Sequence, residues 1–127
     1  MKTPLTSDVT RRHVVDLDVL VASTPSIDGV WRSGVEWGDR VFVFTMNSVY
    51  LMMFVGDDTF VVSGGWFDHR GASPAEMSVT GCSWGGSVIN RRLIAAPGLH
   101  LEFGNGVVTT RIRRVVFARN LDTGAPH

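Results

Sequence analysis

A pair of apolar runs in residues 41–55 constrains the fold of this chain more than any other feature. Residues 41–44 are Val-Phe-Val-Phe, a polar break follows at 45–48, and residues 49–55 are Val-Tyr-Leu-Met-Met-Phe-Val. Side chains alternate between the two faces of a strand, so a hairpin that is apolar at every position needs cover on both faces. Either the sheet closes into a compact barrel or sandwich with loops over its outside, or a second copy of the chain covers the outer face.

The composition indicates one globular domain. The chain has 127 residues, of which 44% are apolar and 19% charged, and we expect a single domain over 1–127 with terminal extensions at 1–12 and 120–127. Twelve basic and twelve acidic side chains give a formal net charge of zero. A chain with this balance has no overall electrostatic attraction to nucleic acid or to an anionic membrane. The same balance weakens the electrostatic repulsion between copies of the chain.

The single cysteine, Cys82, excludes an intramolecular disulfide framework and a site built from several thiolates. Residues 1–12 lack the apolar core of a signal peptide, and no run approaches the roughly 20 apolar residues of a membrane helix. We therefore expect a cytoplasmic protein with no cofactor, no metal and no membrane partner.

Alternating apolar residues and turn signals predict about seven or eight short strands. Besides the hairpin, the expected strands are residues 13–21, 30–35, 60–62, 77–80, 99–103 and 107–112. Residues 66–76 are predicted to be a loop, and residues 87–96 fit a short helix or a strand. Asn105-Gly106 is typical of a two-residue type I′ turn and places Val108 on the core face and Thr109 on the outer face. The pattern favours an all-β fold, a small antiparallel barrel, with a two-sheet sandwich as the alternative.

Residues 81–86, Gly-Cys-Ser-Trp-Gly-Gly, match the G-x-S-x-G pattern of a hydrolase nucleophile elbow around Ser83. That elbow requires a parallel sheet with crossover helices and an acid followed by a histidine, whereas the later histidines here are His100 and His127. A glycine-rich strand corner is the simpler interpretation. A thiol nucleophile at Cys82 has no partner fixed by spacing. A hydrolase is therefore the third hypothesis for function.

The basic residues gather at 91–92 and 111–114, and Trp66 and Trp84 would offer stacking surfaces for a single nucleic-acid strand. Against this, the adjacent Arg113 and Arg114 point to opposite faces of a strand, and the chain is neutral overall. Nucleic acid is therefore a disfavoured partner.

Three segments carry a resemblance to a group of known proteins. They are Thr45-Met46-Asn47-Ser48-Val49-Tyr50, Val62-Ser63-Gly64-Gly65 and Gly81-Cys82-Ser83-Trp84-Gly85-Gly86-Ser87. Together they resemble small uncharacterised bacterial all-β proteins with a T-x-N-S-x-Y segment followed by a G-S-x-x-G-G-S segment, over residues 36–117. The resemblance implies a shared fold and brings no activity or ligand. Cys82 departs from that pattern, so no catalytic role is carried over.

The leading prediction is a non-enzymatic, homo-oligomeric β-domain that acts as a structural or interaction module. Its self-association surface is expected on one parity of the hairpin, at Phe42, Phe44, Leu51, Met53 and Val55. The alternative is a small barrel that binds a small molecule or a short single nucleic-acid strand. The residues expected to bind that ligand are Tyr50, Trp66, Ser83, Trp84 and Arg111.

Overall fold

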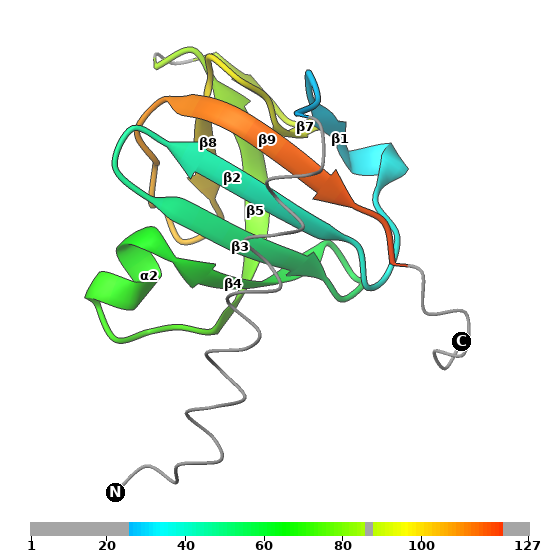
Figure 1. Cartoon of the computed structure of the whole chain (residues 1–127), viewed down its shortest axis with the longest axis horizontal. Helices are drawn as coiled ribbons and strands as arrows, with labels where there is room; N and C mark the ends of the chain where they lie inside the picture. The colour runs from blue at the N-terminus through cyan, green and yellow to red at the C-terminus, as the bar shows by residue number, and fades with distance from the viewer. Residues whose placement is uncertain (1–25, 86–87, 121–127) are drawn as a thin grey trace, which may run out of the picture.

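The computed structural model describes residues 26–85 and 88–120, which form the all-β fold of Figure 1. Its strands are β1 (Val30–Trp31), β2 (Arg40–Thr45), β3 (Val49–Phe54), β4 (Thr59–Gly64), β5 (Ala75–Ser83), β6 (Ile89–Asn90), β7 (Leu93–Ala95), β8 (His100–Phe103) and β9 (Ile112–Ala118). A 3-10 helix, η1, spans Arg32–Gly34, and the α-helix α2 spans Gly65–His69. The strand expected at 13–21 lies outside the described residues.

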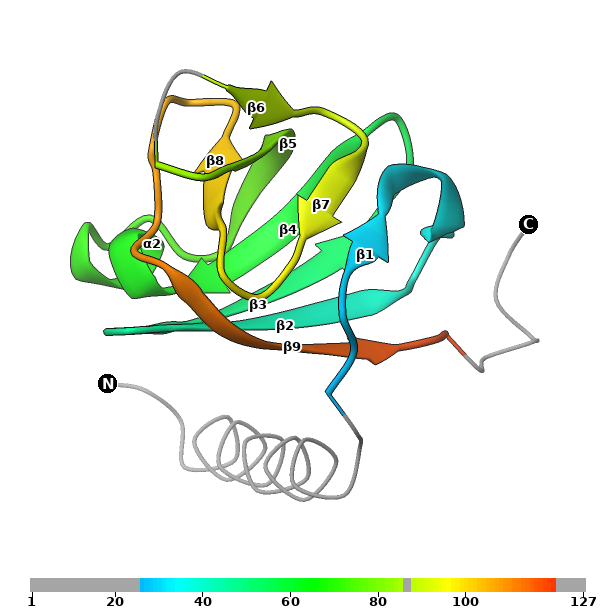
Figure 2. The same ribbon diagram turned by 90° about the horizontal axis from the view of Figure 1, so that it is seen from above.

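The main sheet curls into an open half-barrel. Its strands follow the order β6-β5-β4-β3-β2-β9, β8 pairs with β5, and β1 and β7 form a separate two-stranded sheet. All of these pairings are antiparallel. Figure 2 shows β9, β2 and β3 as one layer, with β5, β7 and β8 folded back over it. The predicted all-β, barrel-like antiparallel fold is confirmed, with the small sheet placed beside the open half-barrel.

The register of the β2–β3 hairpin decides which of its faces lies in the core. Val41 and Val43 pair with Met52 and Tyr50, and all four side chains belong to the buried core cluster. The residues between them point to the opposite side because side chains alternate along a strand. Phe42, the first of these, therefore belongs to the outer face together with the rest of the predicted self-association set in these two strands.

The turn between β2 and β3 is held by the side chain of Thr45. Its Oγ1 accepts the Ser48 N–H at 3.1 Å and donates to the Ser48 carbonyl oxygen at 3.2 Å, while the Thr45 N–H donates to that same oxygen at 2.8 Å. A threonine hydroxyl bonded to the local backbone stabilises a tight turn. The threonine and serine of this segment therefore have structural roles.

The Gly64-Gly65 pair lies where the chain leaves β4 and passes close to β3. The two φ angles are +96° and +48°, in the region that favours glycine. A β-carbon at Gly64 would overlap the Val49 carbonyl oxygen, and one at Gly65 would overlap the Tyr50 ring. Two of the segments that carry the resemblance therefore pack against each other.

We expect Gly64→Ala to lower the free energy of unfolding by about 3 kcal/mol, because it adds backbone strain to a clash with β3. Denaturant titration followed by circular dichroism measures this loss. Gly71→Ala is the matched control, since Gly71 has a φ of +67° and no atom within 4 Å of an added β-carbon. If both variants lose the same free energy of unfolding, the close contact with Val49 contributes nothing to the effect of Gly64→Ala.

Two predictions for the segment 66–96 are settled by the structure. The expected loop at 66–76 is wrong in part, because most of α2 and the start of β5 lie there. The segment 87–96, for which a helix and a strand were left open, contains β6 and β7. The five-residue helix is too short to give a periodic apolar pattern, which explains why it was missed.

The predicted two-residue turn at Asn105-Gly106 is wrong by one residue. The Phe103 N–H donates to the Val107 carbonyl at 2.9 Å, so three residues, 104–106, form the loop, and Gly106 has a φ of +92°. This is the common three-residue hairpin loop with a left-handed glycine in its last position. The extra residue reverses the faces: Val108 is 52% exposed and Thr109 is buried. Strand β9 then begins at Ile112 and pairs with β2.

Candidate functional site

The outer face of β2 and β3 is apolar, and on β4 it continues at Val61, beside Ser63. Phe44 lies opposite Val49, Phe42 opposite Leu51, and Met53 opposite Val61. In Figure 2 no strand or helix of the described chain lies over this side of β2 and β3. The sequence predicts that the hairpin needs cover on both faces, and no strand or helix of the described residues covers the outer one.

Burial divides this outer face into two halves. Phe42 is 3% exposed, and its β9 neighbour Val116 is buried as well, although neither belongs to the core cluster. The half over β2 and β9 is therefore not accessible to another molecule. Leu51, Met53 and Val61 are only half-buried. The half over β3 and β4 is the accessible part, and we refer to Val49, Leu51, Met53 and Val61 as the β3–β4 patch.

The remaining residues of the predicted self-association set lie at the margins of this patch. The Phe44 ring has the Arg114 guanidinium over it, 5.4 Å from its centroid, and is half-buried. Val55 follows β3, where its N–H donates to the Thr59 carbonyl at 2.9 Å, and it is also half-buried. Leu51 and Met53 are therefore the members of that set best placed for contact with another molecule.

Two opposite charges flank the β3–β4 patch in a single row across the sheet. The row runs Arg40, Met53, Val61, Glu76, from β2 to β5. Arg40 and Glu76 are both exposed, and neither forms an ion pair with another described residue. Strands lie about 4.8 Å apart, so the two positions are separated by roughly 14 Å and do not pair within one chain. Each charge is left facing solvent.

The residues predicted to bind a ligand lie in separate places. Tyr50 is buried, its hydroxyl accepts the Trp66 N–H at 3.2 Å, and its ring packs against Phe103. Ser83 lies four residues along β5 from Val79, the residue opposite Phe103, which is roughly 13 Å. Tyr50 and Trp66 therefore form one group, and Ser83 belongs to another.

The other two predicted ligand-binding residues are exposed. Trp84 follows Ser83 at the end of β5 and is 61% exposed. Arg111 lies just before β9 and donates from Nη1 to the Gly98 carbonyl at 2.8 Å. Neither side chain lines either of the two clefts described on this surface.

The first three residues of the G-x-S-x-G segment, residues 81–83, form the buried end of β5. Ser83 is buried and lies directly opposite His100 in β8, whose Nδ1 is 2.9 Å from the Thr109 carbonyl oxygen. Cys82 is buried in the core, and its thiol donates to the Ile94 carbonyl at 3.3 Å. Burial raises the pKa of the Cys82 thiol to about 12, so the thiolate is a minor species at neutral pH. Neither nucleophile is open to a substrate from solvent.

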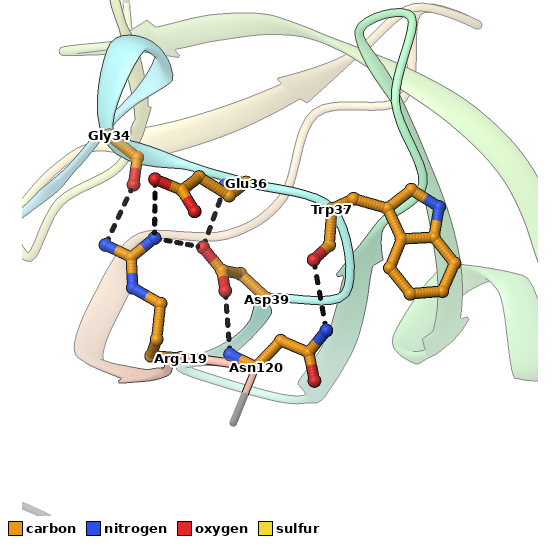
Figure 3. Close-up of polar contacts among 6 residues, drawn as sticks. All are labelled: Gly34, Glu36, Trp37, Asp39, Arg119 and Asn120. Carbon is orange, nitrogen blue, oxygen red and sulfur yellow. Dashed lines mark hydrogen bonds and ion pairs between the residues drawn. The ribbon is translucent and has the colours of Figure 1, made fainter. Parts of the chain in front are cut away.

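A buried carboxylate, Asp39, joins the loop before β2 to the end of β9, as Figure 3 shows. Its Oδ2 accepts the Glu36 N–H and the Arg119 Nη1, both at 2.8 Å, and its Oδ1 accepts the Asn120 N–H at 2.8 Å. The Asn120 side chain also donates to the Trp37 carbonyl at 3.3 Å. No local sequence pattern marks Asp39 as a buried carboxylate. The group is structural, because its carboxylate oxygens bond to the protein itself.

Replacing Asp39 tests how strongly this carboxylate holds β9 in place. We expect Asp39→Ala to lower the free energy of unfolding by about 3 kcal/mol, because it removes three hydrogen bonds to a buried charge. Glu36→Ala is the control, since the Glu36 carboxylate is exposed and contacts Arg119 only at 3.6 Å. Its expected loss is below about 0.5 kcal/mol. Thermal and denaturant unfolding of both variants measure the difference.

No group of three or more His, Cys, Asp or Glu side chains that could hold a metal ion occurs in residues 26–85 and 88–120. No helix in the same residues has the length and apolar character to cross a membrane. Comparison of the chain with protein-family models, with curated proteins and with solved structures finds no match.

Proposed function

We propose that this protein is a non-enzymatic, self-associating β-domain, in which the β3–β4 patch of one copy packs against the same patch of a second copy. The observation that carries the proposal is the row Arg40, Met53, Val61, Glu76, with two apolar side chains between two unpaired, opposite charges. Such a row is complementary to itself, which is what a two-fold symmetric contact requires.

The geometry of the contact follows from that symmetry. A two-fold axis between Met53 and Val61 sets the apolar pair of one copy on the apolar pair of the other. The same axis brings Arg40 of each copy to Glu76 of the second copy, so two ion pairs form at the rim. Apolar burial then supplies the affinity, and the charges set the register of the contact. A formal net charge of zero leaves little overall repulsion to oppose association.

The patch is small, so the proposed association is weak. Standard interfaces use about 20–30 residues on each side, more than this half of a face provides. We expect a monomer–dimer equilibrium with a dissociation constant on the order of 10 μM. Such a module would respond to its own concentration in the cell. We also propose a bacterial source and a cytoplasmic location, for which a single cysteine is suited.

A lysine at position 53 tests the apolar part of the contact. We expect Met53→Lys to raise the dissociation constant about 100-fold, because two unpaired ammonium groups would be buried in each dimer. Light scattering behind size exclusion and sedimentation equilibrium, both over a range of concentrations, measure the mass. Val108→Lys is the matched control, because it places a lysine on an exposed valine outside the patch. A wild-type chain that stays monomeric at every concentration contradicts the proposal.

A charge exchange tests the rim pairs and the symmetry together. Arg40→Glu and Glu76→Arg should each weaken self-association about tenfold, because each places like charges opposite each other. A mixture of the two variants should restore association, since each mixed dimer then pairs a glutamate with an arginine at both rims. Sedimentation of each variant alone and of the mixture gives the three values. A mixture no stronger than its components would exclude this two-fold arrangement.

A further inference from the structure

A cleft of about 770 Å³ lies where η1 meets the turn between β6 and β7. It is lined by Trp31, Arg32, Ser33, Arg91 and Arg92. Small-molecule sites commonly measure about 300–1,000 Å³. The lining combines one indole ring with three guanidinium groups and has no acidic side chain. These residues are distinct from the β3–β4 patch, so the cleft concerns a second activity of the same chain.

Arg32 forms the framework of this cleft. Its backbone N–H donates to the Arg92 carbonyl at 2.7 Å, and its Nε donates to the Arg91 carbonyl at 2.8 Å. Its Nη2 donates to the Val79 carbonyl at 2.8 Å, and its Nη1 pairs with Asp58. The Arg32 guanidinium is therefore engaged by the protein, and it fixes the backbone of the turn at 91–92.

Arg91 and Arg92 differ from Arg32, because their backbone is fixed while their guanidinium groups form no ion pair with the described chain. Both carbonyl oxygens of the turn are bonded to Arg32, and the Arg92 N–H donates to Asn90 Oδ1 at 3.0 Å. The side chains of Arg91 and Arg92 are exposed and form no ion pair with the rest of the described chain. A fixed backbone that carries two unpaired guanidinium groups is suited to an anion, because less conformational entropy is lost on binding.

Trp31 supplies the second kind of contact. It lies in β1 opposite Leu93 of β7, and it remains 53% exposed in the wall of the same cleft. An exposed indole offers a flat surface on which an aromatic ring stacks, and every nucleobase has such a ring. A simple inorganic anion would leave this surface unused.

We propose that the cleft binds a nucleotide unit, with its base stacked on Trp31 and its phosphate held by Arg91 and Arg92. Guanidinium groups match phosphate oxygens in paired hydrogen bonds, and the neighbouring indole adds the stacking surface. A free nucleotide and a short single strand both present this unit. The absence of a carboxylate from the lining avoids repulsion of the phosphate.

The proposal is tested by equilibrium binding to the full chain at low salt. The probes are ATP, a six-nucleotide oligothymidylate and inorganic tripolyphosphate, and isothermal titration calorimetry measures their affinities. We expect ATP or the oligonucleotide to bind with a dissociation constant on the order of 100 μM or tighter, and tripolyphosphate to bind at least about tenfold more weakly than ATP. Tighter binding of the oligonucleotide identifies a strand as the source of the unit, and tighter binding of ATP identifies a free nucleotide.

Two variants and two matched controls assign the binding to this cleft. Trp31→Ala and the double change Arg91→Ala with Arg92→Ala should each weaken binding at least about tenfold. Trp37→Ala and Arg113→Ala are the controls, because both residues are exposed and neither lines the cleft. Circular dichroism verifies that each variant is folded.

Three results would overturn the proposal. One is the failure of the wild-type chain to bind either nucleotide probe. Another is binding that survives both cleft variants. The third is tripolyphosphate binding as tight as that of ATP and insensitive to Trp31→Ala, which would leave an anion site without a base. None of these results depends on whether the chain self-associates.

Discussion

The carboxylate of Asp39 is the interaction on which the arrangement of the sheet depends. It bonds to the backbone of Asn120 and to the side chain of Arg119, immediately after β9, and so fixes where that strand ends beside β2. A shift of one residue in an antiparallel register would exchange the two faces of a strand. Val115 would then leave the core and Val116 would enter it. The buried charge, together with the ladder between β2 and β9, therefore fixes which side chains of β9 face the core and which face outward.

The described residues form two surfaces of different chemistry. The β3–β4 patch is apolar and flanked by Arg40 and Glu76, and it is the surface that we propose for contact with a second copy. The cleft beside η1 has an indole and two guanidinium groups that form no ion pair with the described chain, and we propose it for a ligand that is both aromatic and anionic. The two surfaces share no residue. A chain with a formal net charge of zero thus concentrates its charges locally rather than over the whole molecule.

The central hairpin and the all-β class could be predicted because consecutive apolar residues and turn signals are local properties of the sequence. Which parity of the hairpin faces the core could not be predicted, because both parities are apolar, and the register of β2 and β3 places Phe42 and Met53 on the outer face. The turn at Asn105 was misplaced because the dipeptide preference ignores Gly104, which lengthens the loop by one residue. The cleft beside Trp31 was not predicted as a site, because it depends on bonds from Arg32 to residues about 60 positions away. Local patterns carry no information about such contacts.

The buried thiol of Cys82 has a further consequence for how the molecule can be observed. Its pKa of about 12 and its place in the core prevent reaction with a thiol reagent at neutral pH while β5, β7 and β8 remain packed. Modification then requires a transient opening of this layer. The rate at which a native sample reacts, divided by the rate of the unfolded chain, gives the fraction of time that the layer is open. The reaction of this single cysteine therefore measures how often the layer opens, without any engineered label.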